Sequence, residues 1–134
     1  MRWLDQQSWW RMNNRGTTAL EFALVAPVLL MLLIGIIQLG ILFYVQAGLK
    51  STVEDAARYA TLWPTPSQLQ IEERIQTHRF GMDVRNIVGP TVTFSENQAP
   101  NFVTISMSYK VTLNYVFGKK TLVLSESRRA YVAK

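Results

Sequence analysis

Hydrophobic residues follow three different patterns along the 134-residue chain, and each pattern predicts a different element. A nearly unbroken apolar run fills residues 22–46, in which Gln38 and Gln46 are the strongly polar side chains. Residues 49–60 carry apolar side chains at helical spacing, and residues 103–117 alternate between apolar and mostly polar side chains. Together these patterns predict a membrane-spanning helix, its amphipathic continuation and a β-strand.

The apolar run is long enough to cross a lipid bilayer. A helix of about 25 residues spans roughly 37 Å, compared with about 30 Å of hydrocarbon. A cleavable secretory signal has an apolar core of only about 7–15 residues, although residues 45–47 loosely resemble a cleavage site. A buried helix of a soluble protein is disfavoured, because little else in the chain is available to surround it. We therefore expect a single-pass membrane helix, with Phe43 and Tyr44 at the far interface.

The flank that precedes this run is basic and predicts the orientation of the helix. The net charge of the chain is +5, and Arg2, Arg11 and Arg15 precede the run together with a single acid, Asp5. Positively charged flanks tend to stay in the cytoplasm. We therefore expect a cytoplasmic N-terminus and an exported C-terminal part.

The helix is expected to continue outside the membrane to residue 63. Its apolar side chains recur at steps of four and three, at Leu49, Val53, Ala56 and Ala60. On the polar side, Glu54 is spaced to pair with both Lys50 and Arg58. Pro64 and Pro66 predict the end of the helix.

A second, shorter helix is expected over residues 67–79. Its apolar residues Leu69, Ile71 and Ile75 are expected to face inward. The adjacent Glu72 and Glu73 do not share a helix face, so a solvated surface is favoured over paired carboxylates for acid–base chemistry.

The last part of the chain predicts β-structure, with strands over residues 91–94, 103–117 and 122–132. The middle strand is expected to contain a bend or a bulge, because it exceeds the usual length of about 3–10 residues. Its inward side chains are expected at the odd positions, Val103, Ile105, Met107, Tyr109, Val111, Leu113, Tyr115 and Phe117. The apolar face of this antiparallel sheet needs a cover, and the exported stripe of the long helix is the natural one. The predicted fold class is α+β.

The segment RGTTALEFALVAP, residues 15–27, places one carboxylate at the start of the apolar run. Two explanations of this residue, Glu21, stay open on local grounds. Thr18 and Glu21 have the spacing of a capping box, and a carboxylate in the first turn gains about 0.3–1 kcal/mol from the helix dipole. The alternative is a charge kept near lipid for a function.

The same segment resembles the processing site of type IV pilin-like precursors. In those proteins a basic leader and a glycine precede an apolar helix with Glu at the fifth position after the cut. Glu21 is the fifth residue if Thr17 follows a cut at Gly16. The continuation EFALVAPVLLMLLIGIIQLG resembles the TadE-like family, minor pilin-like proteins of tight-adherence (Tad, or Flp) pilus systems. The rest of the chain agrees with that family only in general layout.

The resemblance implies four parts of the chain. Residues 1–16 are a leader, residues 17–46 a transmembrane helix, residues 47–63 its exported continuation, and residues 64–134 a small exported domain. A membrane-embedded prepilin peptidase is expected to cut between Gly16 and Thr17. The new ammonium on Thr17 is expected to pair with Glu21 of its own or an adjacent subunit and so set the register between helices. Small residues and a tolerated proline would let neighbouring helices approach closely, at Ala19, Ala23, Ala26, Pro27, Gly35 and Gly40.

The implied function is a structural subunit of a Tad-type (type IVc) pilus, with priming or capping of the filament as its expected role. The implied partners are other pilin-like subunits, the prepilin peptidase, the inner-membrane assembly platform and the lipid bilayer. The implied location is the bacterial inner membrane, with the C-terminal domain in the periplasm and incorporation into an extracellular pilus as a further step. The alternative is an uncleaved signal-anchor protein whose exported domain binds an envelope partner or ligand.

Other function classes find little support in the sequence. The chain has no cysteine and one histidine, His78, and it lacks a metal-ligand cluster and a phosphate-binding loop. No enzyme activity, cofactor or metal is therefore expected. Two basic pairs, Lys119–Lys120 and Arg128–Arg129, raise the question of nucleic acid, but lysines commonly protect strand edges and no aromatic stacking platform is evident.

Overall fold

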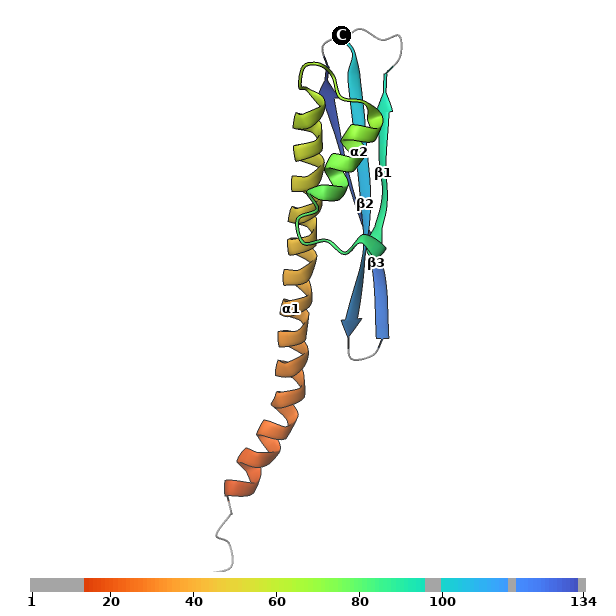
Figure 1. Ribbon diagram of the computed structural model, residues 1–134. Helices are drawn as coiled ribbons and strands as arrows, with labels where there is room; N and C mark the ends of the chain where they lie inside the picture. The colour runs from red at the N-terminus through yellow and green to blue at the C-terminus, as the bar shows by residue number, and fades with distance from the viewer. Residues whose placement is uncertain (1–13, 96–99, 116–117, 133–134) are drawn as a thin grey trace, which may run out of the picture.

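The computed structural model describes residues 14–95, 100–115 and 118–132, and Figure 1 shows their arrangement. One long helix lies against one face of a three-stranded antiparallel sheet, and its N-terminal half extends alone beyond the sheet. The elements are α1 (Asn14–Ala60), α2 (Gln68–Thr77), the 3₁₀ turn η1 (Val84–Asn86), β1 (Ile87–Phe94), β2 (Phe102–Tyr115) and β3 (Gly118–Tyr131). The expected α+β class is confirmed.

Helix α1 has 47 residues and contains both the apolar run and the amphipathic stripe. It ends at Ala60, before the expected end at residue 63, because its last turn tightens. The backbone N–H groups of Thr61 and Leu62 each donate a hydrogen bond of 3.1 Å to carbonyls three residues earlier. Such bonds satisfy the terminal carbonyls of a helix and end it.

Pro27 lies inside α1, where its ring removes one helical hydrogen bond and crowds the carbonyl of Ala23. Figure 1 shows that α1 bends in its N-terminal part, where Pro27 lies. A proline is an ordinary cause of a helix bend. The expectation that the helix would continue through this proline is confirmed.

The sheet has the order β1-β2-β3, so the long strand β2 lies in the centre. The pairing of β2 with β3 is regular from Phe102 opposite Tyr131 to Tyr115 opposite Gly118. The bulge expected in the middle strand is therefore wrong, because β3 partners β2 over its full length. The irregularity lies instead in β1, between Val88 and Thr91.

This irregularity contains Gly89, whose φ of 96° is a conformation that favours glycine. The pairing of β1 with β2 resumes on the N-terminal side of this irregularity, so that the strand begins at Ile87 and not at residue 91. Strand β3 likewise begins at Gly118, four residues before the expected start. Lys119 and Lys120, which precede the expected start of this strand, pair with Asn114 and Leu113 of β2.

The core lies between the C-terminal half of α1 and the inner face of the sheet. The four stripe residues of α1 named above are all fully buried. The inward positions of β2 are buried from Val103 to Val111, as expected. Beyond Val111 the inward side chains of β2 are less covered, because Leu113 is half-buried and Tyr115 is 50% exposed. The expectation that Tyr115 belongs to the core is therefore wrong. Phe117 lies outside the described residues.

Helix α2 packs against α1 and β1 through Ile71 and Ile75. It begins with a capping box in which the side chain of Ser67 accepts from the backbone of Gln70 and the side chain of Gln70 accepts from Ser67. Leu69 is 77% exposed, so its expected inward orientation is wrong. A step of two residues along a helix turns the side-chain direction by about 200°, which places Leu69 opposite Ile71.

Two ion pairs fasten α1 to its neighbours. The guanidinium of Arg74 in α2 donates to both carboxylate oxygens of Asp55, at 2.9 and 3.3 Å. Arg128 of β3 donates a hydrogen bond to Glu54. These hydrogen bonds are the main cause of the lowered pKa of both carboxyl groups. The hydrogen-bond partner of Glu54 is therefore Arg128 from another element, while the charges of its helix neighbours Lys50 and Arg58 also lower its pKa.

Candidate processing and assembly site

The N-terminal half of α1 is exposed on nearly all sides. In its most apolar stretch only 6% of the residues are buried within the protein, and its large exposed side chains include Phe22, Leu29 and Ile37. Among the described residues, α1 is the helix that is long and apolar enough to cross a membrane. The interpretation as the buried core helix of a soluble protein is therefore wrong.

Gly16 and Thr17, the expected cleavage position, lie within α1, which already begins at Asn14. The bond at which the cut is expected is therefore helical in the full chain. Nothing lies within 4 Å of the position that a Cβ atom would take on Gly16. Glycine favours a helix by about 1 kcal/mol less than alanine, so this turn is easier to unwind than its neighbours.

Glu21 is exposed on α1, one turn beyond Thr17. The capping-box explanation is wrong for the full chain, because the helix begins four residues before Thr18 and has no acid in its first turn. The N-cap expected at Thr18 lies inside a continuous helix. A cut after Gly16 would bring Glu21 into the first turn of the shortened helix. Local capping in the uncut chain therefore does not account for the carboxylate.

The small residues of α1 do not form one stripe. Ala19, Ala23 and Ala26 recur at steps of four and three, so they share one face. Gly35 and Gly40 are five positions apart, which separates them by about 140° around the helix. Neither has an atom within 4 Å of the position that a Cβ would occupy. Any close approach of neighbouring helices would therefore use more than one side of α1.

A second feature of α1 is an exposed apolar face opposite the buried stripe. Its members follow helical spacing, so they lie one above another on the side of the helix that faces away from the sheet; we call Ile36, Gly40, Phe43 and Ala47 the back face. Ile36 is 58% and Phe43 is 68% exposed. The sequence could not separate this face from the rest of the apolar run, because every side of the run is hydrophobic.

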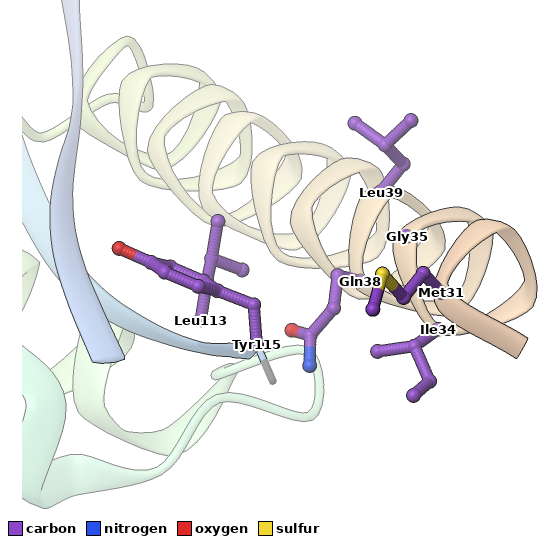
Figure 2. Close-up of a pocket in the computed structure, with 7 residues that line it drawn as sticks. All are labelled: Met31, Ile34, Gly35, Gln38, Leu39, Leu113 and Tyr115. Atoms are coloured by element: carbon purple, nitrogen blue, oxygen red, sulfur yellow. The ribbon is translucent and has the colours of Figure 1, made fainter. Parts of the chain in front are cut away.

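The β2–β3 hairpin reaches down to the apolar half of α1 and forms a cleft with it (Figure 2). The side-chain amide of Gln38 donates a hydrogen bond of 2.8 Å to the backbone carbonyl of Asn114. The cleft has a volume of about 320 Å³ and is almost wholly apolar; its lining residues are Met31, Ile34, Gly35, Gln38, Leu39, Leu113 and Tyr115. In the sequence Gln38 is only a polar interruption of the run, so neither its partner nor the cleft was expected.

The polar residues considered for other chemistry stand apart from this site. His78 is exposed at the end of α2, as expected, and its Nδ1 lies 2.9 Å from the hydroxyl of Thr77. Glu72 accepts a hydrogen bond from Gln68 on the surface of the same helix. Within the described ranges no group of three or more His, Cys, Asp or Glu side chains could hold a metal ion.

Comparison with known proteins gives one finding that bears on α1. A family model described as TadE-like protein matches residues 16–58. The match begins at Gly16, includes Glu21 and runs into the buried stripe, so the resemblance seen in the sequence is confirmed over this helix. It leaves α2 and the sheet outside. No curated protein and no solved structure matches the chain.

Proposed function

We propose, from the match of α1 to the TadE-like family, that the chain is a pilin-like structural subunit of a Tad pilus system, anchored in the inner membrane by the N-terminal half of α1. The observation that carries this proposal is the exposed apolar half of α1 with one carboxylate, Glu21, near its start. Such a helix needs lipid or other helices around it. The family is one of structural pilus proteins, which argues against catalysis as the main role.

The proposed maturation is a cut between Gly16 and Thr17 by a prepilin peptidase. It would leave an ammonium on Thr17 about 6 Å along the helix axis from Glu21. An isolated charge costs about 2.5–3.5 kcal/mol at the centre of a bilayer and less near its edge. Pairing Glu21 with the new amine of an adjacent subunit would offset part of this cost and fix the stagger between the two helices.

Lateral packing would then use the faces of α1 that this protein leaves uncovered. The alanine stripe from Ala19 to Ala26 allows close approach near the cytoplasmic side. The back face offers Phe43 as an apolar anchor and Gly40 as a place where a second helix can approach closely. As a subunit leaves the bilayer, neighbouring helices would replace lipid on the alanine stripe.

The remaining domain supports a minor rather than a repeating role, with priming or capping of the filament as the proposed step. The sheet has two edge strands, β1 and β3, of which β3 packs against α1 and β1 against α2. The basic flank before the apolar run favours an orientation with the leader in the cytoplasm and the domain in the periplasm. The proposed partners are other pilin-like subunits, the peptidase and the assembly platform.

The experiment that tests this function is the mass of the chain after co-expression with a prepilin peptidase. The wild-type chain is expected to lose residues 1–16 and begin at Thr17. Gly16→Leu should keep the full mass, because a bulky side chain replaces the glycine at the cut. Gly40→Leu is the matched control and should be cut like the wild type. An intact wild-type chain would instead support the uncleaved signal anchor.

A further inference from the structure

The end of the β2–β3 hairpin, at Asn114 and Tyr115, lies beside residues of α1 within the expected transmembrane segment 17–46. Figure 1 shows the hairpin running along α1 toward the N-terminal end of the helix, beyond the level of α2. The bond from Gln38 to the carbonyl of Asn114 fixes this level, and the cleft below it reaches Met31. Residues 17–46 therefore cannot all cross the hydrocarbon unless the hairpin enters it as well.

The chemistry of the hairpin excludes such a depth. Its outer face carries the polar side chains of Lys110, Thr112, Asn114, Lys119 and Thr121, all exposed. Strand β3 is also an edge strand, and in lipid its unpaired backbone groups would find no hydrogen-bond partner. The hydrocarbon must therefore end near the hairpin tip.

The length of α1 allows this shorter span. From Thr17 to Ile36 the helix rises by roughly 30 Å, which equals the thickness of a typical hydrocarbon core. Gly16 then lies at the cytoplasmic edge and Gln38 at the opposite edge. The expected boundary at Gln46 would lie about two turns farther out.

The hairpin end also has the composition of a surface that faces anionic lipid. Residues 108–125 contain three lysines, Lys110, Lys119 and Lys120, and no acid. Lys119 faces outward opposite Asn114, whereas Lys120 lies opposite Leu113 on the face toward the cleft. Tyr115, half-exposed beside that cleft, is a residue type enriched at membrane interfaces.

We propose that the β2–β3 hairpin rests on the surface of the bilayer on the exported side and sets the depth of the helix. Lys119 and Lys120 contact the phosphates of anionic lipids, and the apolar cleft receives the upper part of an acyl chain. This inference rests on the membrane anchoring proposed above. It also places the upper part of the back face outside the hydrocarbon, where a second helix can reach it.

The depth of the hairpin can be measured directly, because the chain has no cysteine of its own. Full-length Asn114→Cys and Ser127→Cys variants carry an environment-sensitive fluorophore at the two ends of the same outer face. Both are reconstituted into phosphatidylethanolamine–phosphatidylglycerol vesicles with a headgroup-linked nitroxide lipid as quencher. We expect strong quenching at position 114 and little at 127. A label at Gln46→Cys should also be quenched little.

Equal quenching of the labels at positions 114 and 127 would contradict the contact between the hairpin and the bilayer. A label at position 46 that lies at headgroup depth would contradict it as well. A label at Leu30→Cys, read with an acyl-chain nitroxide, separates this failure from loss of anchoring. If position 30 is quenched while 114 is not, the helix is anchored and only the hairpin contact is wrong. If position 30 is not quenched, the anchoring and this inference both fail.

The role of the lysines has its own test. The double variant Lys119→Gln, Lys120→Gln should lose the difference in quenching at position 114 between phosphatidylglycerol-containing and phosphatidylcholine vesicles. Lys50→Gln, on the exposed side of α1, is the matched control and should retain that difference. If the double variant retains it too, anionic lipid is not recognised by this hairpin.

Discussion

The side-chain amide of Gln38 donates a hydrogen bond to the backbone carbonyl of Asn114 and so joins the apolar half of α1 to the hairpin tip. The two residues are 76 positions apart in the chain. Below this bond the described residues of α1 are nearly all exposed apart from the cleft with Leu113 and Tyr115, and above it the helix is progressively buried by the sheet. Gln38 therefore marks the change from an anchor to a packed domain.

Removing this bond should loosen the hairpin tip. Gln38→Leu keeps the approximate size and the apolar character of the run but deletes the donor. We expect a loss of about 0.5–1.5 kcal/mol in the free energy of unfolding, the usual net value of one hydrogen bond. Chemical unfolding of the full chain in detergent micelles would measure it. Gln46→Leu, an exposed residue of the same type on the same helix, should cost less; equal losses would show that the bond contributes nothing.

Two leucines that look alike in sequence should differ sharply on truncation. Leu49→Ala empties a fully buried position between helix and sheet, and we expect a loss of about 2–5 kcal/mol. Leu69→Ala removes a side chain that is 77% exposed, and we expect a change within about 0.5 kcal/mol. Thermal unfolding of the two full-length variants gives the comparison. A large loss at Leu69 would contradict the orientation of α2.

The ion pair between Asp55 and Arg74 should make stability depend on pH in the acidic range. The hydrogen bonds from Arg74 hold the pKa of Asp55 below its ordinary value of 3.8. A lowered pKa means that the stabilisation is present above the ordinary value and is lost as pH falls through the folded value. Because both side chains are about one-third exposed, we expect no more than about 1 kcal/mol at neutral pH.

Asp55→Asn tests this expectation. The variant should be less stable than the wild type at pH 7, and the difference should shrink as pH falls below 3.8. Denaturant unfolding at several pH values measures the difference. Glu73→Gln, an exposed carboxylate on α2, is the control. A difference between Asp55→Asn and the wild type that stays constant with pH would show that the charge is not what stabilises the contact.

The proposed register role of Glu21 predicts a separation between processing and assembly. Glu21→Gln retains the size and hydrogen-bonding geometry of the side chain but lacks the charge that would pair with an amine. We expect this chain to be cut after Gly16 and to fail to associate with neighbouring subunits. Mass spectrometry measures the first result and crosslinking in the membrane the second. Normal association of Glu21→Gln would remove the register hypothesis, while Glu73→Gln should leave both results unchanged.

Local periodicity predicted which elements form and most of their inward positions. Side chains three and four positions apart share a helix face, and alternate side chains share a sheet face. The buried stripe from Leu49 to Ala60 and the alternation from Val103 to Val111 could therefore be predicted from the sequence. The segment around Gly16 and Glu21 also pointed to the family, because its information lies in adjacent residues.

Some predictions failed because a distant element supplied the deciding contact. Glu54 is spaced to pair with Lys50 and Arg58 on its own helix, yet its carboxylate forms an ion pair with Arg128 of β3. Tyr115 continues the apolar alternation, but the helix beside it leaves a cleft and the ring stays half-exposed. Lys119 and Lys120 precede the expected strand, but β2 is long enough to pair with both of them.

The sequence by itself determined that a long apolar helix precedes a small sheet, because length and periodicity are properties of neighbouring residues. The depth to which that sheet reaches along the helix was decided only in the tertiary structure. It depends on the regular pairing of β2 with β3 and on the bond from Gln38 to Asn114. No local pattern encodes that bond, since its donor and acceptor meet only after the helix and the hairpin have packed together.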